Sequence, residues 1–121
     1  MLINSYMKMV KNSDPKNLTD SQLRIIFEKI IIRIKDKPVG FFKFKKMRAV
    51  RGLWCSGDEI LIDHNREIVP TIIHEMLHDL YEDNNEKWVA RVESKIAQII
   101  TPKDVRILLT EFLCKMDMSK K

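Results

Sequence analysis

The sequence contains few of the residues that break up or crosslink a chain. Its 121 residues include three Gly, four Pro and two Cys. So little Gly and Pro excludes collagen-like and low-complexity chains. Two cysteines far apart in sequence, Cys55 and Cys114, cannot form a disulfide framework. We therefore predict a folded chain in which both cysteines are buried as small apolar residues.

Long hydrophobic runs are also absent. Residues 1–16 contain no apolar stretch long enough for a signal peptide, and charged residues interrupt the apolar stretches elsewhere. We expect a cytoplasmic protein with no membrane partner. At about 150 residues per domain, 121 residues predict one domain, residues 1–121, which is large enough to bury a core.

Charge is unevenly divided along the chain. Residues 1–57 carry 13 Lys and Arg against 4 Asp and Glu, a balance of +9, and residues 58–121 carry 9 against 13, a balance of −4. A basic half could bind nucleic acid, and the alternating aromatic and basic residues of Phe41–Arg51 could stack single-stranded bases. Lysines more often solvate an exposed face or protect an edge strand, so nucleic acid is an alternative partner and is not the favoured one.

Helix-start signals divide most of the chain into amphipathic helices. Thr19–Gln22 has the form of a capping box, Pro70 suits the first turn of a helix, and Thr101–Asp104 supplies a cap and first turn. Apolar residues at helical spacing follow each signal. The predicted helices run from Thr19 to about Asp36, from Thr71 to about Tyr81, from about Asn85 to Ile100, and from Thr101 to Met116.

Three short runs between the first two helices predict strands. Phe41–Met47 alternates apolar and charged residues, and Arg48–Trp54 and Glu59–Asp63 are joined by the turn-like Cys55–Asp58. We expect three antiparallel strands, with Phe42 and Phe44 facing the core. The predicted fold class is α+β, with an N-terminal helix, a small three-stranded antiparallel sheet and three further helices.

The most informative motif is His74-Glu75-Met76-Leu77-His78. On a helix, His74 and His78 lie four residues apart on one face and can reach one Zn²⁺ at about 2.1 Å. Glu75 is not a ligand in this arrangement, because it takes the proton of the metal-bound water that attacks a carbonyl. The alternative is a pair of ordinary surface histidines. We predict one bound Zn²⁺ and hydrolysis of peptide bonds.

A catalytic zinc site needs a third protein ligand. No histidine follows His78, so a carboxylate on the next helix is the natural source, and Glu86 and Glu93 are the candidates. If the two helices pack antiparallel about a short turn, counting outward from the turn favours Glu86. Glu93 then either accepts a hydrogen bond from the imidazole N–H of a ligand without contacting the metal, or is solvated. The rival assignment makes Glu93 the ligand.

Three further residues have both a functional and an ordinary interpretation. His64 could stabilise an oxyanion, although a histidine in a loop is more often simply exposed. Tyr81 could donate its hydroxyl to the transition state, but packing is the commoner role. Asp79 either orients an imidazole or begins a solvated turn.

The segments Glu59–Asp63, Thr71–Leu80 and Glu86–Val89 together resemble the minigluzincins, which are small single-domain zinc metallopeptidases from archaea, and the short HExxH proteins of bacteriophages. The resemblance covers about residues 39–100, and its specific element is the HEMLH motif. Two differences are the longer basic N-terminus and an alanine, Ala90 or Ala97, where related larger enzymes often keep an Asp after the ligand Glu.

The resemblance implies a minimal zincin fold, in which a three-stranded sheet lies above the active-site helix. It implies His74, His78 and Glu86 as zinc ligands and Glu75 as the base, with a peptide or protein substrate along the edge strand. Some minigluzincins are latent because a segment of their own chain blocks the cleft. Residues 116–121 or the first fifteen residues could act in this way.

Two functions remain open at this stage. The favoured one is a zinc metalloendopeptidase of the gluzincin type. The alternative is a non-catalytic, zinc-stabilised binding module that uses its basic N-terminal half to engage nucleic acid or a protein.

Overall fold

The computed structural model describes residues 14–55, 57–65 and 67–116. The elements, in chain order, are η1 (Pro15–Asn17), α2 (Asp20–Lys35), β1 (Phe42–Phe44), β2 (Gly52–Cys55), β3 (Glu59–Ile62), α3 (Ile68–Leu80), α4 (Glu86–Ile99) and α5 (Pro102–Cys114). The predicted α+β class is confirmed. The helix bounds fall within about three residues of those predicted.

Side-chain caps explain where three of the helices begin. Thr19 accepts a hydrogen bond from the backbone of Gln22, whose side chain accepts one from the backbone of Thr19, and these bonds complete the predicted capping box of α2. Thr101 and Asp104 form the same reciprocal pair at the start of α5. Asn85 caps α4 alone. Each cap satisfies backbone N–H groups that have no partner inside the helix.

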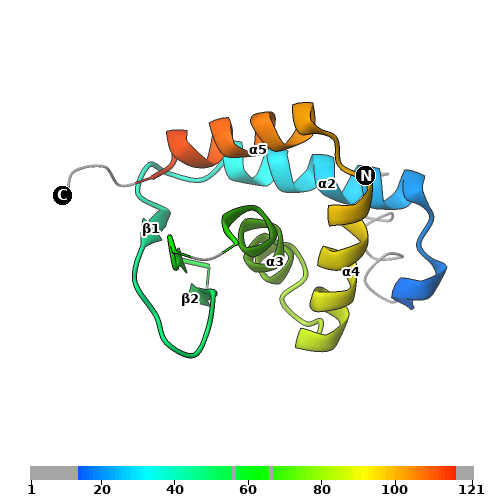
Figure 1. The fold of residues 1–121 in the computed structure, drawn as a ribbon, viewed down its shortest axis with the longest axis horizontal. Coiled ribbons are helices and arrows are strands. Elements are labelled where there is room, and N and C mark those ends of the chain that lie inside the picture. Colours follow the sequence, from blue (N-terminus) through cyan, green and yellow to red (C-terminus); the bar gives the residue numbers. More distant parts are fainter. Residues whose placement is uncertain (1–13, 56, 66, 117–121) are drawn as a thin grey trace.

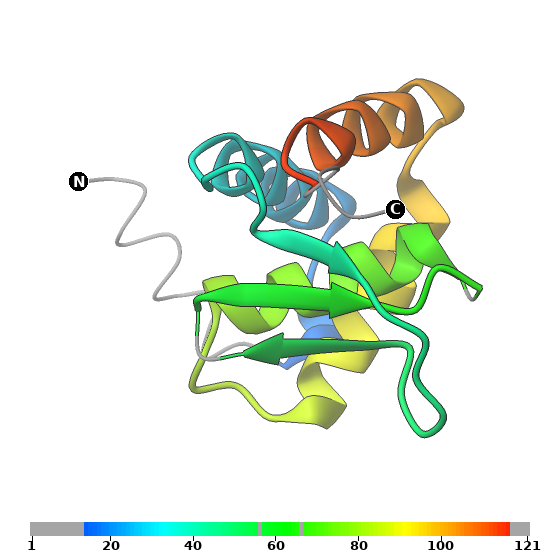
Figure 2. The ribbon, with the colours of Figure 1, turned by 90° about the vertical axis from the view of Figure 1, so that its left-hand side faces the viewer.

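Helix α3 lies at the centre of the fold. It packs against α2, α4 and α5 as well as against β2 and β3. Figure 1 views α3 nearly end-on, with the sheet on one side of it and with α2 and α5 side by side above it. Figure 2 shows the sheet in front and α3 running behind it. A site on α3 therefore lies on a helix that three other helices and two strands contact.

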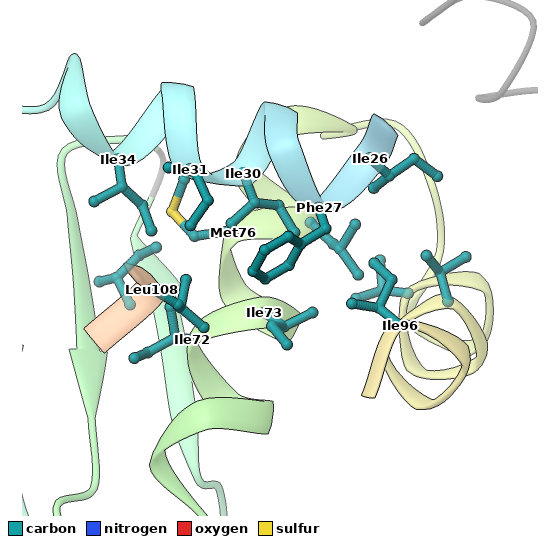
Figure 3. Close-up of a cluster of buried hydrophobic side chains, with 14 of the residues drawn as sticks. Ile26, Phe27, Ile30, Ile31, Ile34, Ile72, Ile73, Met76, Ile96 and Leu108 are labelled. Atoms are coloured by element: carbon teal, nitrogen blue, oxygen red, sulfur yellow. The ribbon is translucent and has the colours of Figure 1, made fainter. Parts of the chain in front are cut away.

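The hydrophobic core joins α2 to α3. In Figure 3 a row of side chains from α2 points toward α3, while Ile96 of α4 and Leu108 of α5 close the ends of the cluster. The labelled core residues of α2 and α3 are Ile26, Phe27, Ile30, Ile31, Ile34, Ile72, Ile73 and Met76. Their spacing of three and four residues is the apolar stripe that predicted these helices.

The sheet has the strand order β1-β3-β2 within the described residues. Strands β2 and β3 form the predicted antiparallel hairpin, in which the Asp58 N–H donates to the Cys55 carbonyl at 2.9 Å. The prediction that all three strands are antiparallel is wrong, because β1 pairs with β3 in parallel, with Phe42 opposite Ile60. After β1 the chain crosses to the opposite edge of the sheet and forms β2 there. It then returns as β3, which lies between β1 and β2 and fully buries Ile60 and Ile62.

The two edges of the sheet differ. Beside β1, the backbone N–H groups of Gly40 and Phe42 donate to the Lys115 carbonyl at 2.9 and 3.3 Å, and Met116 pairs with Phe42. No strand pairs with the outer edge of β2 within the part of the chain that the structure describes. Figure 2 shows β2 as the lowest of the three arrows. The open edge is therefore on β2.

Three burial predictions are wrong. Phe44 is 43% exposed, although Phe42 is buried as expected. Cys55 is only partly buried because it ends the edge strand β2. Cys114 lies two residues beyond the buried Phe112 on α5, so it points to the opposite, exposed face of that helix. Within the described residues, no helix is both long enough and apolar enough to cross a membrane.

Candidate metal centre

Helix α3 brings His74 and His78 to one face, with their ring centroids 5.0 Å apart. Glu86 is the first residue of α4 and follows a short connection from the end of α3. Its Oε2 lies 2.8 Å from Nε2 of His78, and its Oε1 contacts Nε2 of His74. The carboxylate of Glu86 therefore bridges the two imidazoles.

The two helices cross instead of packing antiparallel. In Figure 1 α3 is seen nearly end-on, whereas α4 runs within the plane of the view. Glu86 still reaches both histidines because it occupies the end of α4 that adjoins the connection. Glu93 lies two turns further on, where its Oε1 is 2.8 Å from Nδ1 of His74. The structure thus places Glu86 between the two Nε2 atoms and places Glu93 behind one ring, and the ligand assignment itself stays a prediction.

Glu93 also contacts a cation. The guanidinium of Arg51 donates to the same Oε1 at 2.9 Å. Glu93 therefore lies behind the imidazole of His74 and is itself held by Arg51. A carboxylate in this position fixes the tautomer and the orientation of the ring.

Opposite charges shift the pKa values of these groups. Burial alone would lower the pKa of His74, but the hydrogen bond to Glu93 and the charges of Glu86 and Glu75 outweigh it and raise that pKa. Burial alone would raise the pKa of Glu86, but the two histidines outweigh it and lower that pKa. The pKa of Glu93 is lowered in the same way, because its bonds to His74 and Arg51 outweigh burial.

The donor set fits a metal ion. One ligand atom from each of His74, His78 and Glu86 lies within 4.8 Å of the other two, and ligands about 2.1 Å from a tetrahedral zinc are about 3.4 Å apart. When Nδ1 of His74 donates to Glu93, its Nε2 and the Glu86 oxygen are both acceptors, so a proton or a cation must lie between them. The side chain of Glu86 is 70% exposed, and this leaves it room to adjust around an ion. These three residues could therefore hold a metal ion.

Glu75 lies next to this group but faces a different environment. It is 7% exposed, and burial is the main cause of its raised pKa. The backbone N–H of Trp54 on β2 donates to its carboxylate. A carboxylate with a raised pKa is a stronger base than an exposed one, which suits general base catalysis.

A cavity of about 430 Å³ brings the metal group and the sheet edge together. Both histidines, Glu75 and Glu86 line it, together with residues 49–51 before β2 and the first three residues of β2. The lining residues are Ala49, Val50, Arg51, Gly52, Leu53, Trp54, His74, Glu75, His78 and Glu86. The four residues of the predicted site therefore share one cavity.

Two of the other candidates lie outside the cavity. His64 is exposed, and its ring packs against Phe44 with centroids 5.5 Å apart. Tyr81 is 3% exposed and packs against Trp88 at 5.2 Å, in agreement with its packing interpretation. Neither residue lines the cavity.

Asp79 matches neither of its predicted roles. It is 2% exposed, and its carboxylate accepts hydrogen bonds from Arg33, Lys37 and the indole N–H of Trp54. These bonds outweigh burial and lower its pKa. Asp79 therefore ties α2 and β2 to α3.

The close approach of β2 to the site is a feature that the motif alone does not predict. Gly52 is buried, and a Cβ added there would lie 2.6 Å from Cγ2 of Thr71 and 3.0 Å from Cγ of Glu75. A glycine inside a strand is a known sign of close backbone approach, so this signal was present in the sequence. The contact of Arg51 with Glu93 leaves no such local signal.

No protein-family model, curated protein or solved structure matches the chain. The resemblance of the motif to the minigluzincins therefore stays an expectation.

Proposed function

We propose that this protein is a zinc-dependent peptidase of the gluzincin type, in which His74, His78 and Glu86 hold the metal and Glu75 is the general base. The observation that carries the proposal is the convergence of three metal-ligating side chains and one buried carboxylate on a single cavity. A buried carboxylate with a raised pKa beside metal-ligating side chains is typical of a functional site, and it favours this proposal over a pair of ordinary surface histidines.

The bound zinc would supply Lewis-acid polarisation of the substrate carbonyl and a lowered pKa for water. Glu75 accepts the proton of the attacking water on its carboxylate and then delivers it to the nitrogen of the departing amine. A hydrogen bond from the Trp54 backbone links that carboxylate to β2, and both residues line the same cavity. Burial of Glu75 supports this role because it raises its affinity for the proton.

The open edge of β2 supports a peptide as the substrate. An extended peptide can pair with the backbone groups of an edge strand, and residues 49–54 line the same cavity as the metal group. Val50 and Leu53 are 42% and 47% exposed beside it, so this wall offers apolar side chains to the substrate. Flexible peptides and unfolded proteins meet these requirements because their backbone is free to extend.

The test is hydrolysis of unfolded casein and of a broad peptide library by the zinc-loaded protein. We expect cleavage that a chelator stops and that Glu75→Gln abolishes while zinc binding is retained. Glu28→Gln, an exposed glutamate on α2, is the matched control and should cleave like the natural chain.

The assay should include the full chain and variants without residues 1–13 or 117–121, because both segments lie outside the described residues. Met116, where the second candidate blocking segment begins, lies at the β1 edge, away from β2. If all three forms bind zinc and none cleaves any substrate, the peptidase proposal fails and the binding-module alternative replaces it.

A further inference from the structure

Arg51 connects the wall of the cavity to the metal group. Its guanidinium donates to Oε2 of Glu67 at 2.8 Å and to Oε1 of Glu93 at 2.9 Å. Its backbone carbonyl accepts from the N–H of Asp63 at 2.8 Å, just beyond β3. Arg51 is therefore held at three points immediately before β2 begins, and it also lines the cavity.

One oxygen atom links Arg51 to His74. Oε1 of Glu93 accepts from the guanidinium and lies 2.8 Å from Nδ1 of the imidazole. The side chains of Glu93 and His74 are only 14% and 9% exposed and that of Arg51 is 31% exposed, so the bond between Glu93 and His74 is the better shielded of the two from water. Hydrogen bonds between charged groups are short and strong in such surroundings. The place of the guanidinium therefore sets the place of the carboxylate and, through it, the plane of the ring.

We infer that Arg51 is a positioning residue that fixes the orientation of His74 through Glu93. The inference rests on the metal-binding half of the proposed function. Without Arg51, Glu93 would keep one fixed donor in place of two, so the carboxylate and the ring would be free to rotate together. The segment that begins β2 would also lose its attachment to α4. Arg51 thus lines the cavity proposed to bind substrate and also supports the proposed metal ligand His74 through Glu93.

The test is a zinc titration against a chromophoric chelator, made on the full chain and on Arg51→Gln, Glu93→Gln and the double variant. Loss of a partner outside the coordination shell typically weakens metal binding about 10- to 100-fold, and we expect this for Glu93→Gln. Arg51 acts through one further hydrogen bond, so we expect about 3- to 10-fold for Arg51→Gln. The double variant should bind zinc no more weakly than Glu93→Gln, because Arg51 acts only through Glu93.

A spectroscopic measurement separates positioning from a general loss of stability. With Co²⁺ in place of zinc, the visible absorption bands of Arg51→Gln should shift relative to the natural chain, and Arg51→Lys should restore most of the affinity and the spectrum. Arg24→Gln is the matched control, because Arg24 of α2 pairs with the buried Asp104 of α5, neither residue lines the cavity, and the substitution should change neither the affinity nor the spectrum.

Two results would overturn the inference: unchanged zinc affinity in Arg51→Gln, or a loss that adds in full to that of Glu93→Gln. Absence of peptide cleavage in a zinc-binding natural chain would refute the peptidase proposal and leave these comparisons valid. A natural chain that binds no metal contradicts both.

Discussion

The close approach of β2 to Thr71 and Glu75 of α3 makes Gly52 a sensitive position. A Cβ at Gly52 would lie 2.6 Å from Cγ2 of Thr71 and 3.0 Å from Cγ of Glu75. Carbon atoms in ordinary contact are about 3.5 Å apart or more, so Gly52→Ala must open the gap between β2 and α3 by about 1 Å. Thr71 cannot simply turn away, because it is 1% exposed and its hydroxyl donates to the Glu67 carbonyl at 2.7 Å.

The shift should affect stability and activity together. Overpacking of this kind costs about 1–3 kcal/mol of unfolding free energy. The movement would also draw the Trp54 N–H away from Glu75, and a misplacement of about 1 Å can cost about 100-fold in rate. We expect Gly52→Ala to lose about 100-fold in kcat/KM on a peptide substrate. It should keep its zinc affinity, because the added Cβ would clash with Thr71 and Glu75 and with none of the three proposed ligands.

A second substitution tests the cause. Thr71→Ser removes the clashing methyl group and keeps the hydroxyl, so it should restore much of the stability and activity of Gly52→Ala. Gly57→Ala is the control, since a Cβ there meets nothing within 4 Å and only the positive φ of 80° opposes it. It should lose about 1 kcal/mol with no change in kcat/KM. Unchanged melting temperature and activity in Gly52→Ala would refute the reasoning, as would failure of Thr71→Ser to restore either.

Two further predictions concern carboxylates. Glu86→Ala should weaken zinc binding far more than Glu93→Ala, for which about 10- to 100-fold is expected, and parallel zinc titrations showing the reverse order would make Glu93 the ligand. Arg24 holds the pKa of Asp104 well below its usual range, so this carboxylate stabilises the fold above its unfolded pKa of about 4 and loses that effect as the pH falls toward the folded pKa. Asp104→Asn should therefore cost about 1.5–3 kcal/mol at neutral pH, and urea unfolding should show the cost shrinking below about pH 4; a cost independent of pH would contradict it.

Local signals in the sequence were sufficient for the helices and for the spacing of the histidines. Thr19 and Thr101 cap helices through contacts three residues away, and His74 and His78 share a face because the helical repeat alone brings them together. These interactions lie within one turn, so they can be predicted without knowledge of the rest of the fold.

The partner of β1 depends on distant parts of the chain. Alternation of apolar and charged residues predicts that Phe42–Phe44 is a strand, but it does not say which strand lies beside it. The parallel pairing arises because β3 buries Ile60 and Ile62 in the middle of the sheet. Phe44 is exposed because it is the last residue of a short strand at the edge of the sheet.

Support for the candidate site also comes from distant segments. Arg51 meets Glu93 across 42 positions and Asp79 meets Trp54 across 25, and neither pair has a recognisable spacing. Glu86 was favoured by counting along an antiparallel helix pair. The helices cross, but Glu86 still lies against both histidines, because the first residue of α4 is held near α3 by the short connection between them.

We propose that this chain holds a metal ion at His74, His78 and Glu86. The most direct test of this proposal is the metal content of protein purified without added metal, measured by mass spectrometry of the dissolved elements. We predict one zinc per chain in the natural protein and in His64→Ala, which removes the exposed third histidine, and none in His78→Ala. A natural chain without zinc, or a His78→Ala variant that retains one zinc per chain, would contradict the account.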